Sequence, residues 1–441
     1  MKRILFLLFC LLIVKAKAQT WQLMDTAGFT PVGCEYPNIN IIAGVPYIGF
    51  DRGGNPASAM KFNGTHWVYV GNPDFTAGQA NLVSTTNDGV NLIMAFRDGP
   101  HQNRVSVMKY NGTSWVNVGI PGFTTIEAMN IQICLDKFNT IYVAYQDGLA
   151  YPYAASVMKF NGTSWEQVGP TNFSAPDASF VDLAFNSQNV PFVVTRDGTL
   201  GGATVMKFNG TSWENVGNAG FTGVNASWEV LAFDVDTPYV GYSDETDSFR
   251  MNVMKYDGTN WVQVGPVNFS LPIAYHTNLK IYGGVPYVAY DGSGNTLASR
   301  PVVNKFDGTN WVHVGNSNFS LSNCAYTNLE IANNKAYVAY MDWSVGTRLT
   351  AWQIDLGTNV STTDVNRKTI KLEISPNPTS GNILIKGTGA VPFTIRNSIG
   401  SIVASGSLKN ENGFTYLTLL KQPGIYIIET PDSYYKVVVQ E

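Results

Sequence analysis

The chain has 441 residues and a net charge of −4, with 14% charged, 44% hydrophobic and 12% aromatic residues. A mainly disordered chain is excluded because it would have few aromatic residues, and a long coiled coil is excluded because it would be rich in Ala, Glu, Lys and Leu. Beyond residue 18 there are 24 basic and 32 acidic side chains, a net charge of −8. We therefore expect no nucleic-acid partner.

The first 18 residues have the pattern of a secretory signal peptide. Lys2 and Arg3 precede an apolar run, residues 4–14, and Ala16-Lys17-Ala18 follows it. A run of this length is too short to span a membrane as a helix, so we expect cleavage before Gln19. No later apolar run is long enough for a transmembrane segment.

A repeat fills most of the remaining chain. The motif Phe/Tyr-Asn/Asp-Gly-Thr-x-Trp ends at Trp67, Trp115, Trp165, Trp213, Trp261 and Trp311. The spacings between these tryptophans are 48, 50, 48, 48 and 50 residues, and Trp21 stands 46 residues before Trp67. Each unit holds four strand-like runs, with an Asn-Gly or Asp-Gly turn between the last two. Such a unit is typical of one blade of a β-propeller.

The number of units predicts how the ring closes. The second strand of the unit occurs seven times, but only six units are complete through their Trp. The seventh unit ends after the strand around Trp352, and Trp21–Met24 has no blade before it. We therefore predict an all-β, seven-bladed propeller over residues 19–355, in which Trp21–Met24 supplies the outer strand of the last blade. These units resemble those of the kelch and galactose-oxidase-like superfamily, and more closely those of Trp-repeat propellers of secreted bacterial proteins.

A second domain follows a polar linker, residues 356–370. Residues 371–441 read as seven short strands, which predicts a small Ig-like β-sandwich. This segment resembles the type A C-terminal sorting domain of the type IX secretion system of Bacteroidota. The resemblance is carried by Pro376, Asn377, Pro378, Gly400, Gly424, Tyr426 and Lys436.

The resemblance to a sorting domain implies a route of export. The partners it implies are the outer-membrane translocon and a sortase-like peptidase. The protein would cross the periplasm and be released or held at the outer cell surface. A plain adhesive Ig-like module is the alternative interpretation of the same segment.

The chain lacks the usual signatures of catalysis. Its histidines, His66, His101, His276 and His313, are not spaced as metal ligands, and there is neither a Gly-x-Ser-x-Gly motif nor a phosphate-binding glycine loop. We predict no metal, no cofactor and no catalytic residue. Cys34 and Cys324 occupy equivalent places in the first and seventh blades, and we expect two free, packed thiols rather than a bridge. We also expect Cys134 to be buried and unpaired.

Two patterns mark one end of the ring as a candidate site. An Asp follows every second strand, and we interpret it as a loop-capping residue. Arginines fall in the connection after that strand; those proposed for binding are Arg52, Arg104, Arg196, Arg250, Arg300 and Arg348. The repeat alignment also places Tyr36, Trp228, His276 and Tyr326 at equivalent positions before the first strands. Such a rim suits anionic or hydroxyl-rich ligands, although Arg–Asp pairing between blades explains the arginines equally well.

We therefore predict a secreted or cell-surface binding module for a glycan or a peptide. A glycan-active hydrolase or lyase that uses carboxylates at the same mouth is the main alternative. The two differ in whether a deep pocket holds two unpaired carboxylates about 5–9 Å apart. A purely structural spacer is the third hypothesis.

Overall fold

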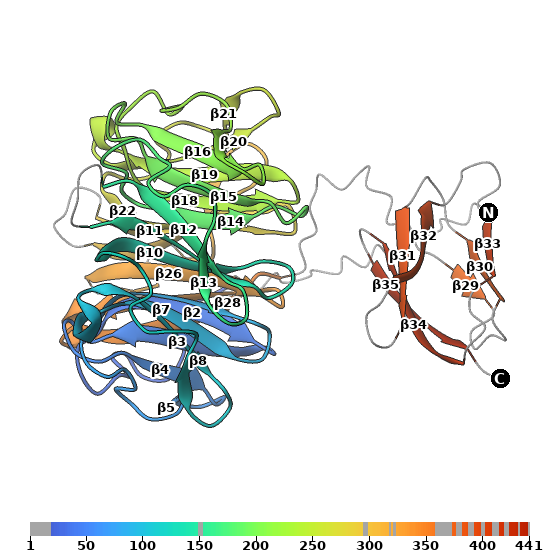
Figure 1. The fold of residues 1–441 in the computed structure, drawn as a ribbon, viewed down its shortest axis with the longest axis horizontal. Helices are drawn as coiled ribbons and strands as arrows, with labels where there is room; N and C mark the ends of the chain where they lie inside the picture. Colours follow the sequence, from blue (N-terminus) through green and yellow to red (C-terminus); the bar gives the residue numbers. More distant parts are fainter. Residues whose placement is uncertain are drawn as a thin grey trace, which may run out of the picture. The chain divides into compact units, whose positions relative to one another are not determined.

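The computed structural model divides the chain into two compact units, residues 1–358 and 359–441 (Figure 1). It describes residues 19–148, 153–293, 299–316, 319–320 and 323–357 of the first unit. In the second unit it describes residues 373–375, 382–386, 392–397, 402–407, 414–418, 423–430 and 433–439. The predicted signal peptide therefore lies outside the described residues, as does most of the predicted linker.

The first unit is the predicted seven-bladed propeller, with four antiparallel strands in each blade. Blades 1 to 3 are β2 (Glu35–Ile42), β3 (Val45–Asp51), β4 (Ser58–Phe62) and β5 (Trp67–Tyr69); β6 (Ala80–Asn87), β7 (Leu92–Asp98), β8 (Arg104–Tyr110) and β9 (Trp115–Asn117); and β10 (Ala128–Leu135), β11 (Ile141–Asp147), β12 (Ala155–Phe160) and β13 (Trp165–Gln167). Blades 4 and 5 are β14 (Asp182–Phe185), β15 (Pro191–Arg196), β16 (Ala203–Phe208) and β17 (Trp213–Asn215); and β18 (Ala226–Asp234), β19 (Thr237–Asp244), β20 (Arg250–Tyr256) and β21 (Trp261–Gln263). Blade 6 is β22 (Ala274–Tyr282), β23 (Val285–Gly292), β24 (Arg300–Phe306) and β25 (Trp311–His313), and blade 7 is β26 (Cys324–Ala332), β27 (Lys335–Asp342), β28 (Arg348–Asp355) and β1 (Gln22–Leu23). Single 3-10 turns follow the second strand in three blades: η1 (Gly99–His101), η2 (Glu245–Asp247) and η3 (Trp343–Val345).

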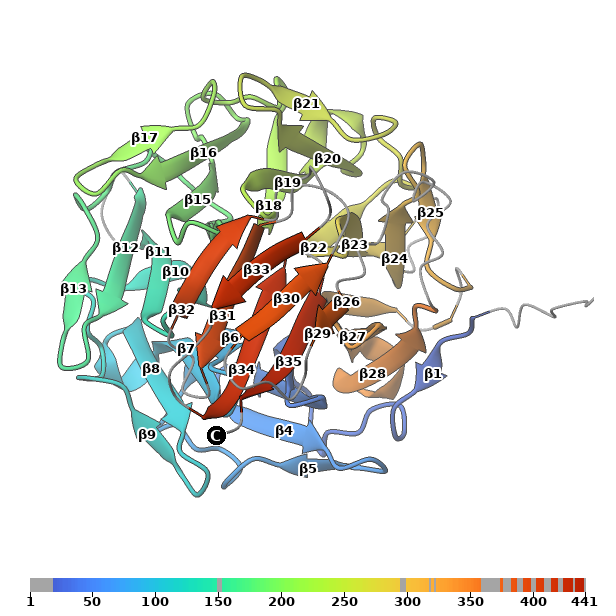
Figure 2. The same ribbon diagram turned by 90° about the vertical axis from the view of Figure 1, so that its right-hand side faces the viewer.

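The ring closes as the sequence predicts. β1 pairs antiparallel with β28, with Gln22 opposite Gln353 and Leu23 opposite Trp352. Figure 2 shows β1 beside β28, where the end of the ring meets its beginning. The N-terminal segment thus completes the seventh blade, so that neither end of the repeat is left with an open outer edge.

The repeated tryptophan joins each blade to the preceding one. In all seven blades its indole Nε1–H donates to a backbone carbonyl oxygen of the blade before, at 2.7–3.3 Å. A phenylalanine from the connection between the two blades stacks on the same indole, with ring centroids 3.9–4.7 Å apart. Trp21 makes both contacts across the closure, with Val314 and Phe319. Buried hydrogen-bonded indoles stabilise strongly, which explains why the motif recurs at every boundary.

The innermost strands are joined around the ring axis by side chains. Each of these strands is a free sheet edge, and its backbone N–H groups need acceptors. At five blade boundaries a polar side chain of the preceding blade accepts one of them, at 2.8–3.3 Å. The acceptors and donors are Asn38 and Thr85, Ser84 and Ile133, Asp182 and Leu231, Asn278 and Leu329, and Asn328 and Ile39. Polar residues near the axis therefore have a structural role.

The three cysteines of the propeller are free thiols. Cys34 and Cys324 are buried and unbridged, in agreement with the prediction. Cys134 is unpaired as predicted, but it is half-buried rather than buried, because it lines the channel along the ring axis. Burial raises the pKa of the Cys34 and Cys134 thiols to about 12, so neither is a reactive thiolate at neutral pH.

The second unit contains seven described strands in two sheets, the number the sequence predicts. One sheet is β29 (Glu373–Ser375), β30 (Asn382–Lys386) and β33 (Phe414–Thr418); the other is β32 (Ile402–Ser407), β31 (Pro392–Asn397), β34 (Gly424–Thr430) and β35 (Ser433–Val439). Ile395, Tyr426, Ile428, Val437 and Val439 are buried in the four-stranded sheet. Within the described parts of both units, no helix is long and apolar enough to cross a membrane.

Candidate binding site at the mouth of the propeller

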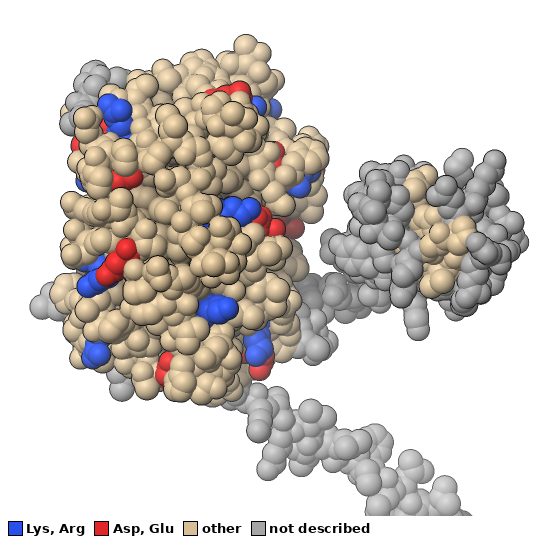
Figure 3. Space-filling model, turned by 60° about the horizontal axis from the view of Figure 1, so that its bottom comes forward, with Lys and Arg blue, Asp and Glu red and all other residues tan. Residues whose placement is uncertain are grey.

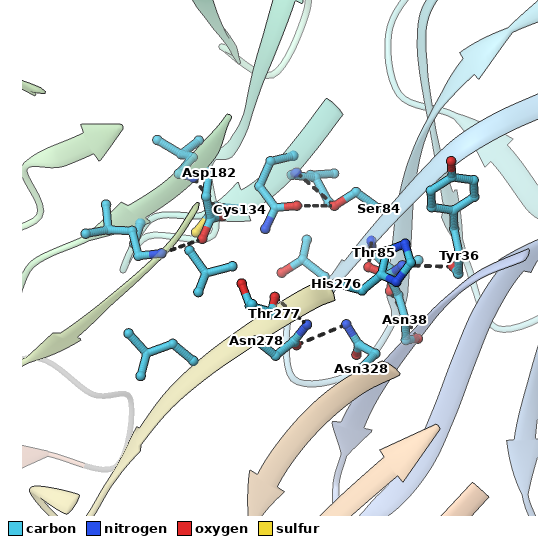
Figure 4. Close-up of a pocket in the computed structure, with 18 of the residues that line it drawn as sticks. Tyr36, Asn38, Ser84, Thr85, Cys134, Asp182, His276, Thr277, Asn278 and Asn328 are labelled. Carbon is cyan, nitrogen blue, oxygen red and sulfur yellow. Dashed lines mark hydrogen bonds between the residues drawn. The ribbon is translucent and has the colours of Figure 1, made fainter. Parts of the chain in front are cut away.

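A polar channel of about 580 Å³ runs along the ring axis and is lined by the innermost strands. Figure 4 shows Asn38, Ser84, Asp182, Asn278 and Asn328 around it. We call the end at which these strands begin the mouth. The loops after the second strands and the blade-to-blade connections lie at the same end, since strand direction alternates in each blade.

One residue at the mouth in each blade adopts a left-handed conformation. These seven residues have φ between 46° and 59°, and none is glycine: Tyr36, Leu82, Asn130, Phe180, Trp228, His276 and Tyr326. In six blades the strand register shifts at this point, which identifies a β-bulge. Left-handed backbone costs about 1–2 kcal/mol for a residue with a Cβ. Strain of this kind tends to persist where a site needs a side chain in a special direction.

Five of these seven residues form one continuous aromatic surface. In blade order they are Phe180, Trp228, His276, Tyr326 and Tyr36, and we call them the aromatic arc. Successive ring centroids are 4.9, 4.4, 4.4 and 4.3 Å apart, with interplanar angles of 45°, 59°, 51° and 38°. All five side chains are half-buried and line the channel. Blades 2 and 3 contribute Leu82 and Asn130 instead, so the arc is open on that side.

His276 is the one arc residue held by a carboxylate. Its Nδ1 lies 2.5 Å from Asp291 Oδ2, and the Asp291 side chain is only 2% exposed. Asp291 Oδ1 accepts the backbone N–H of Thr327 at 3.1 Å. The backbone N–H of Tyr326 donates to the same Nδ1 at 3.2 Å. Both contacts fall on Nδ1, so Nε2 is the ring nitrogen left to meet a ligand.

A buried acid lies next to the arc. Glu229 follows Trp228 and is 2% exposed, and no other residue in the described part of the chain hydrogen-bonds to its carboxyl oxygens. The equivalent positions in the other blades hold only Pro, Val, Ile or Thr. Burial raises the pKa of this carboxyl to about 8, only partly offset by the charge of Arg196. Glu229 is therefore mostly a neutral acid at pH 7.

Four of the seven repeated aspartates are occupied within their own loops. Asp51, Asp197, Asp244 and Asp342 each accept the backbone N–H two residues further on, at 2.8–3.1 Å. This geometry agrees with the prediction of loop-capping residues. The other three repeated aspartates differ from the prediction. Asp291 bonds His276 and the next blade, Asp98 bonds Ser106 and His101, and Asp147 bonds Ser156. Burial also raises the pKa of Asp51 to about 7.

The predicted arginines lie around the mouth, but they have partners there. Arg52 pairs with Asp74 at 2.5 Å, and Arg250 lies 3.7 Å from Asp247. Arg196 grips Glu245 of the next blade through two bonds, at 2.9 and 3.3 Å.

The other predicted arginines are not neutralised by the contacts described, because the partners of Arg104 and Arg348 are uncharged. Arg104 donates to Gln102 at 3.1 Å, Arg348 donates to the Val345 carbonyl at 2.6 Å, and Arg300 begins β24. Among the described residues, no hydrogen bond or ion pair joins a predicted arginine to the aromatic arc.

The predicted aromatic residues do come together: all four belong to the arc. The sequence analysis missed Phe180, Leu82 and Asn130, although the repeat spacing that identified the other four positions also identifies these. It also missed Glu229. The feature that could have identified it is an acidic residue at a repeat position where every other blade has an uncharged residue. Among the described residues there is no cluster of three or more His, Cys, Asp or Glu side chains fit to hold a metal.

The sorting-motif residues are described only in part. Pro376, Asn377, Pro378 and Gly400 lie outside the described residues. Gly424 begins β34, Tyr426 is buried in that strand, and Lys436 lies in β35.

A second hollow, of about 890 Å³, lies between blades 3 and 4 and away from the channel. Two ion pairs line it: Lys159 with Glu166 at 3.9 Å and Lys207 with Glu214 at 3.2 Å. All four side chains are exposed by about two fifths or more, so the pairs are well solvated. Charge elsewhere is also sparse, and Figure 3 shows basic and acidic side chains scattered over the propeller, often side by side.

No protein-family model and no curated protein matches the chain. Several solved structures are similar in part. The polysaccharide lyase Uly1 has 10% identity and a TM-score of 0.48, over 74% of this chain and 91% of its own. The SapL1 lectin in complex with alpha methyl fucoside has 14% identity and a TM-score of 0.46, over 66% and 97%. A fungal fucose-binding lectin from Aleuria aurantia has 15% identity and a TM-score of 0.43, over 66% and 97%. At these values the similarity carries no information on the ligand of this chain.

Proposed function

We propose that this protein is a secreted or cell-surface binding propeller that holds a hydroxyl-rich ligand, a glycan, at the aromatic arc. The observation that carries the proposal is the arc itself: five half-buried rings in contact, each on a residue with left-handed backbone, at the mouth of the channel. Aromatic faces pack against the C–H faces of sugars, and a few fixed polar groups orient the hydroxyls. His276 Nε2 and the Asn130 amide are such groups.

The contacts that the charged residues make within the protein favour a neutral glycan over an anionic one. The arginines with ion pairs are already neutralised, so they offer little attraction to an anionic ligand. Four aspartates are occupied in their own loops, which leaves them unsuited to act as a catalytic pair. A spacer would have no use for seven strained residues at one end.

One observation favours the alternative of a glycan-active enzyme. The His276–Asp291 pair has the arrangement of a general base oriented by a carboxylate. In that case His276 Nε2 would take a proton from the bound sugar or from water. The pair would then be catalytic, and the arc would position the substrate.

A glycan, polysaccharide and peptide array, with product analysis of every hit, tests the proposal and separates it from its alternatives. We expect glycan hits without new reducing or unsaturated ends, and we expect Trp228→Ala to weaken each of them about tenfold or more. Phe138→Ala is the matched control, because Phe138 is 73% exposed at the opposite end of the ring. New chain ends that disappear in His276→Ala would instead establish the enzyme. Only peptide hits, or glycan binding unaffected by Trp228→Ala, would refute the proposal.

We further propose that residues 371–441 direct export through the type IX secretion system. The proposal is supported by the resemblance of Pro376-Asn377-Pro378, Gly400, Gly424, Tyr426 and Lys436 to its sorting domains. Deleting residues 371–441 should leave a folded propeller in the periplasm, because the propeller closes on itself through β1. Cell fractionation in a host with this secretion system is the measurement. Truncated protein in the medium would show that the sorting assignment is wrong.

A further inference from the structure

A pocket smaller than the channel adjoins the aromatic arc between blades 6 and 7. It has a volume of about 360 Å³, and its described lining includes Tyr275, Ser299, Asn323 and Trp343. His276 lines this pocket as well as the central channel. His276 therefore borders both spaces. We call the smaller space the lateral pocket.

The His276 side chain is firmly fixed. The His276 ring packs between Trp228 and Tyr326, with centroids 4.4 Å from each, and Asp291 holds its Nδ1. Asp291 is itself anchored to blade 7 by the Thr327 N–H. His276 is thus held from both sides in a single orientation, and its side chain remains 19% exposed.

The lateral pocket has an exposed aromatic side. Trp343 in η3 is 57% exposed. The equivalent positions in the other blades hold Arg52, Gly99, Gly148, Gly198, Glu245 and Gly292, so the tryptophan is special to blade 7. Ala325, another lining residue, stands where blade 6 has Tyr275, and its small side chain leaves room between the blades.

Ser299 and Asn323 add polar groups to this aromatic lining. A pocket with an aromatic wall and a few polar groups has the same chemistry as the arc, and it suits a second hydroxyl-rich unit. Because one ring borders both spaces, units bound on its two sides would be neighbours along one chain.

We propose that the mouth holds at least two consecutive units of a glycan chain, one at the aromatic arc and the next in the lateral pocket against Trp343. This inference rests on the proposed function and makes it more specific: the ligand is an oligosaccharide rather than a single sugar. His276 contacts both units and sets the register of the chain. Trp343 contacts only the second unit and so contributes affinity only when that unit is bound.

The test is a chain-length series on the full chain. Cello-, xylo-, manno- and malto-oligosaccharides of one to six units are titrated by calorimetry against the wild type and three variants. For a series that binds, we expect affinity to rise about five- to tenfold when the second site becomes filled, which is the range of one aromatic stacking contact. Trp343→Ala should remove that rise and leave the affinity for the single sugar unchanged.

The remaining variants separate the possible failures. Leu200→Ala is the matched control, since Leu200 is a 58% exposed apolar residue in the corresponding loop of blade 4, and it should leave the whole series unchanged. Trp228→Ala should weaken binding at every length. An affinity independent of chain length, together with a loss in Trp228→Ala, would overturn the two-unit inference but keep the proposed function. An equal loss at all lengths in Trp343→Ala would also overturn it. No binding in any series would count against both.

Discussion

At the residue scale, the central feature is a set of side chains whose environments differ from those of their repeats. Many positions have the same environment in all seven blades, as the repeated tryptophans show. Glu229 departs from its repeats by placing a carboxyl where the others place uncharged side chains. His276 departs by recruiting Asp291 away from its own loop. Such departures indicate where one blade carries chemistry that the others lack.

Glu229 predicts a pH dependence of stability. Its pKa is about 8 in the folded chain and near 4.5 in the unfolded one, so between these values only the folded state holds the proton. The Glu229 contribution to the free energy of unfolding is complete below pH 4.5, falls as pH rises toward 8, and is then lost. Across this range the loss is on the order of several kcal/mol.

Glu229→Gln isolates that contribution. The amide cannot ionise, so the variant should lose less stability than the wild type between pH 5 and pH 9 and be the more stable protein at pH 9. Urea unfolding of both proteins at several pH values, followed by tryptophan fluorescence, is the measurement. Other titrating groups, Asp51 among them, are common to both and cancel in the difference. Parallel pH profiles would show that Glu229 is not buried as a neutral acid.

At the element scale, bulges in the innermost strands of blades 1, 5, 6 and 7 determine the direction of four of the five arc side chains. Side chains in a regular strand alternate between two faces. The extra residue of a bulge interrupts that alternation and lets a single residue per blade lean over the mouth. The bulge recurs in six blades, and in blade 4 Phe180 adopts the same left-handed backbone just before β14 without a register shift, so aromatic side chains from five neighbouring blades meet.

The blade boundary offers a matched pair of glycines for a prediction about packing. Gly119 has φ +72°, and a Cβ there would lie 2.9 Å from Trp165 Nε1 and 3.0 Å from Phe160. Gly112 also has positive φ, +96°, but nothing lies within 4 Å of its Cβ position. Gly112→Ala should cost about 1–2 kcal/mol from backbone strain alone. Gly119→Ala should cost clearly more, because it also displaces the indole that joins blades 2 and 3. Equal shifts in unfolding midpoint for the two variants would contradict the role assigned to this contact.

At the scale of the whole molecule, closure by the N-terminal segment makes the propeller one cooperative ring. Trp21 is 6% exposed and Trp213 is 7% exposed, and the two make the same bond and stacking contact. Trp21→Ala and Trp213→Ala should therefore destabilise by similar amounts, about 3–5 kcal/mol each. Removing residues 19–27 should cost more than either, since it opens the edge of β28. A mild effect of Trp21→Ala in urea unfolding would show that the N-terminal segment is not part of the ring.

Much of this architecture could be predicted because it depends on local repetition. The Trp spacing and the unmatched Trp21 predict seven blades and their closure. The partners of Arg196 and Arg52 could not be predicted, because they depend on how loops of different length approach each other. The continuity of the arc could not be predicted either, since it depends on left-handed backbone at the same place in five neighbouring blades. Glu229 lies one residue from a predicted site residue, yet its burial follows only from the packing of blade 5 against blade 4.

The location of a bound glycan is the most direct test of the proposal that the aromatic arc is the binding site. We would determine a crystal structure of the protein with the tightest oligosaccharide from the chain-length series. We expect a sugar ring against Trp228, His276 and Tyr326, with the next unit beside Trp343. A glycan bound instead in the hollow between blades 3 and 4, or on residues 371–441, with the aromatic arc empty, would contradict it.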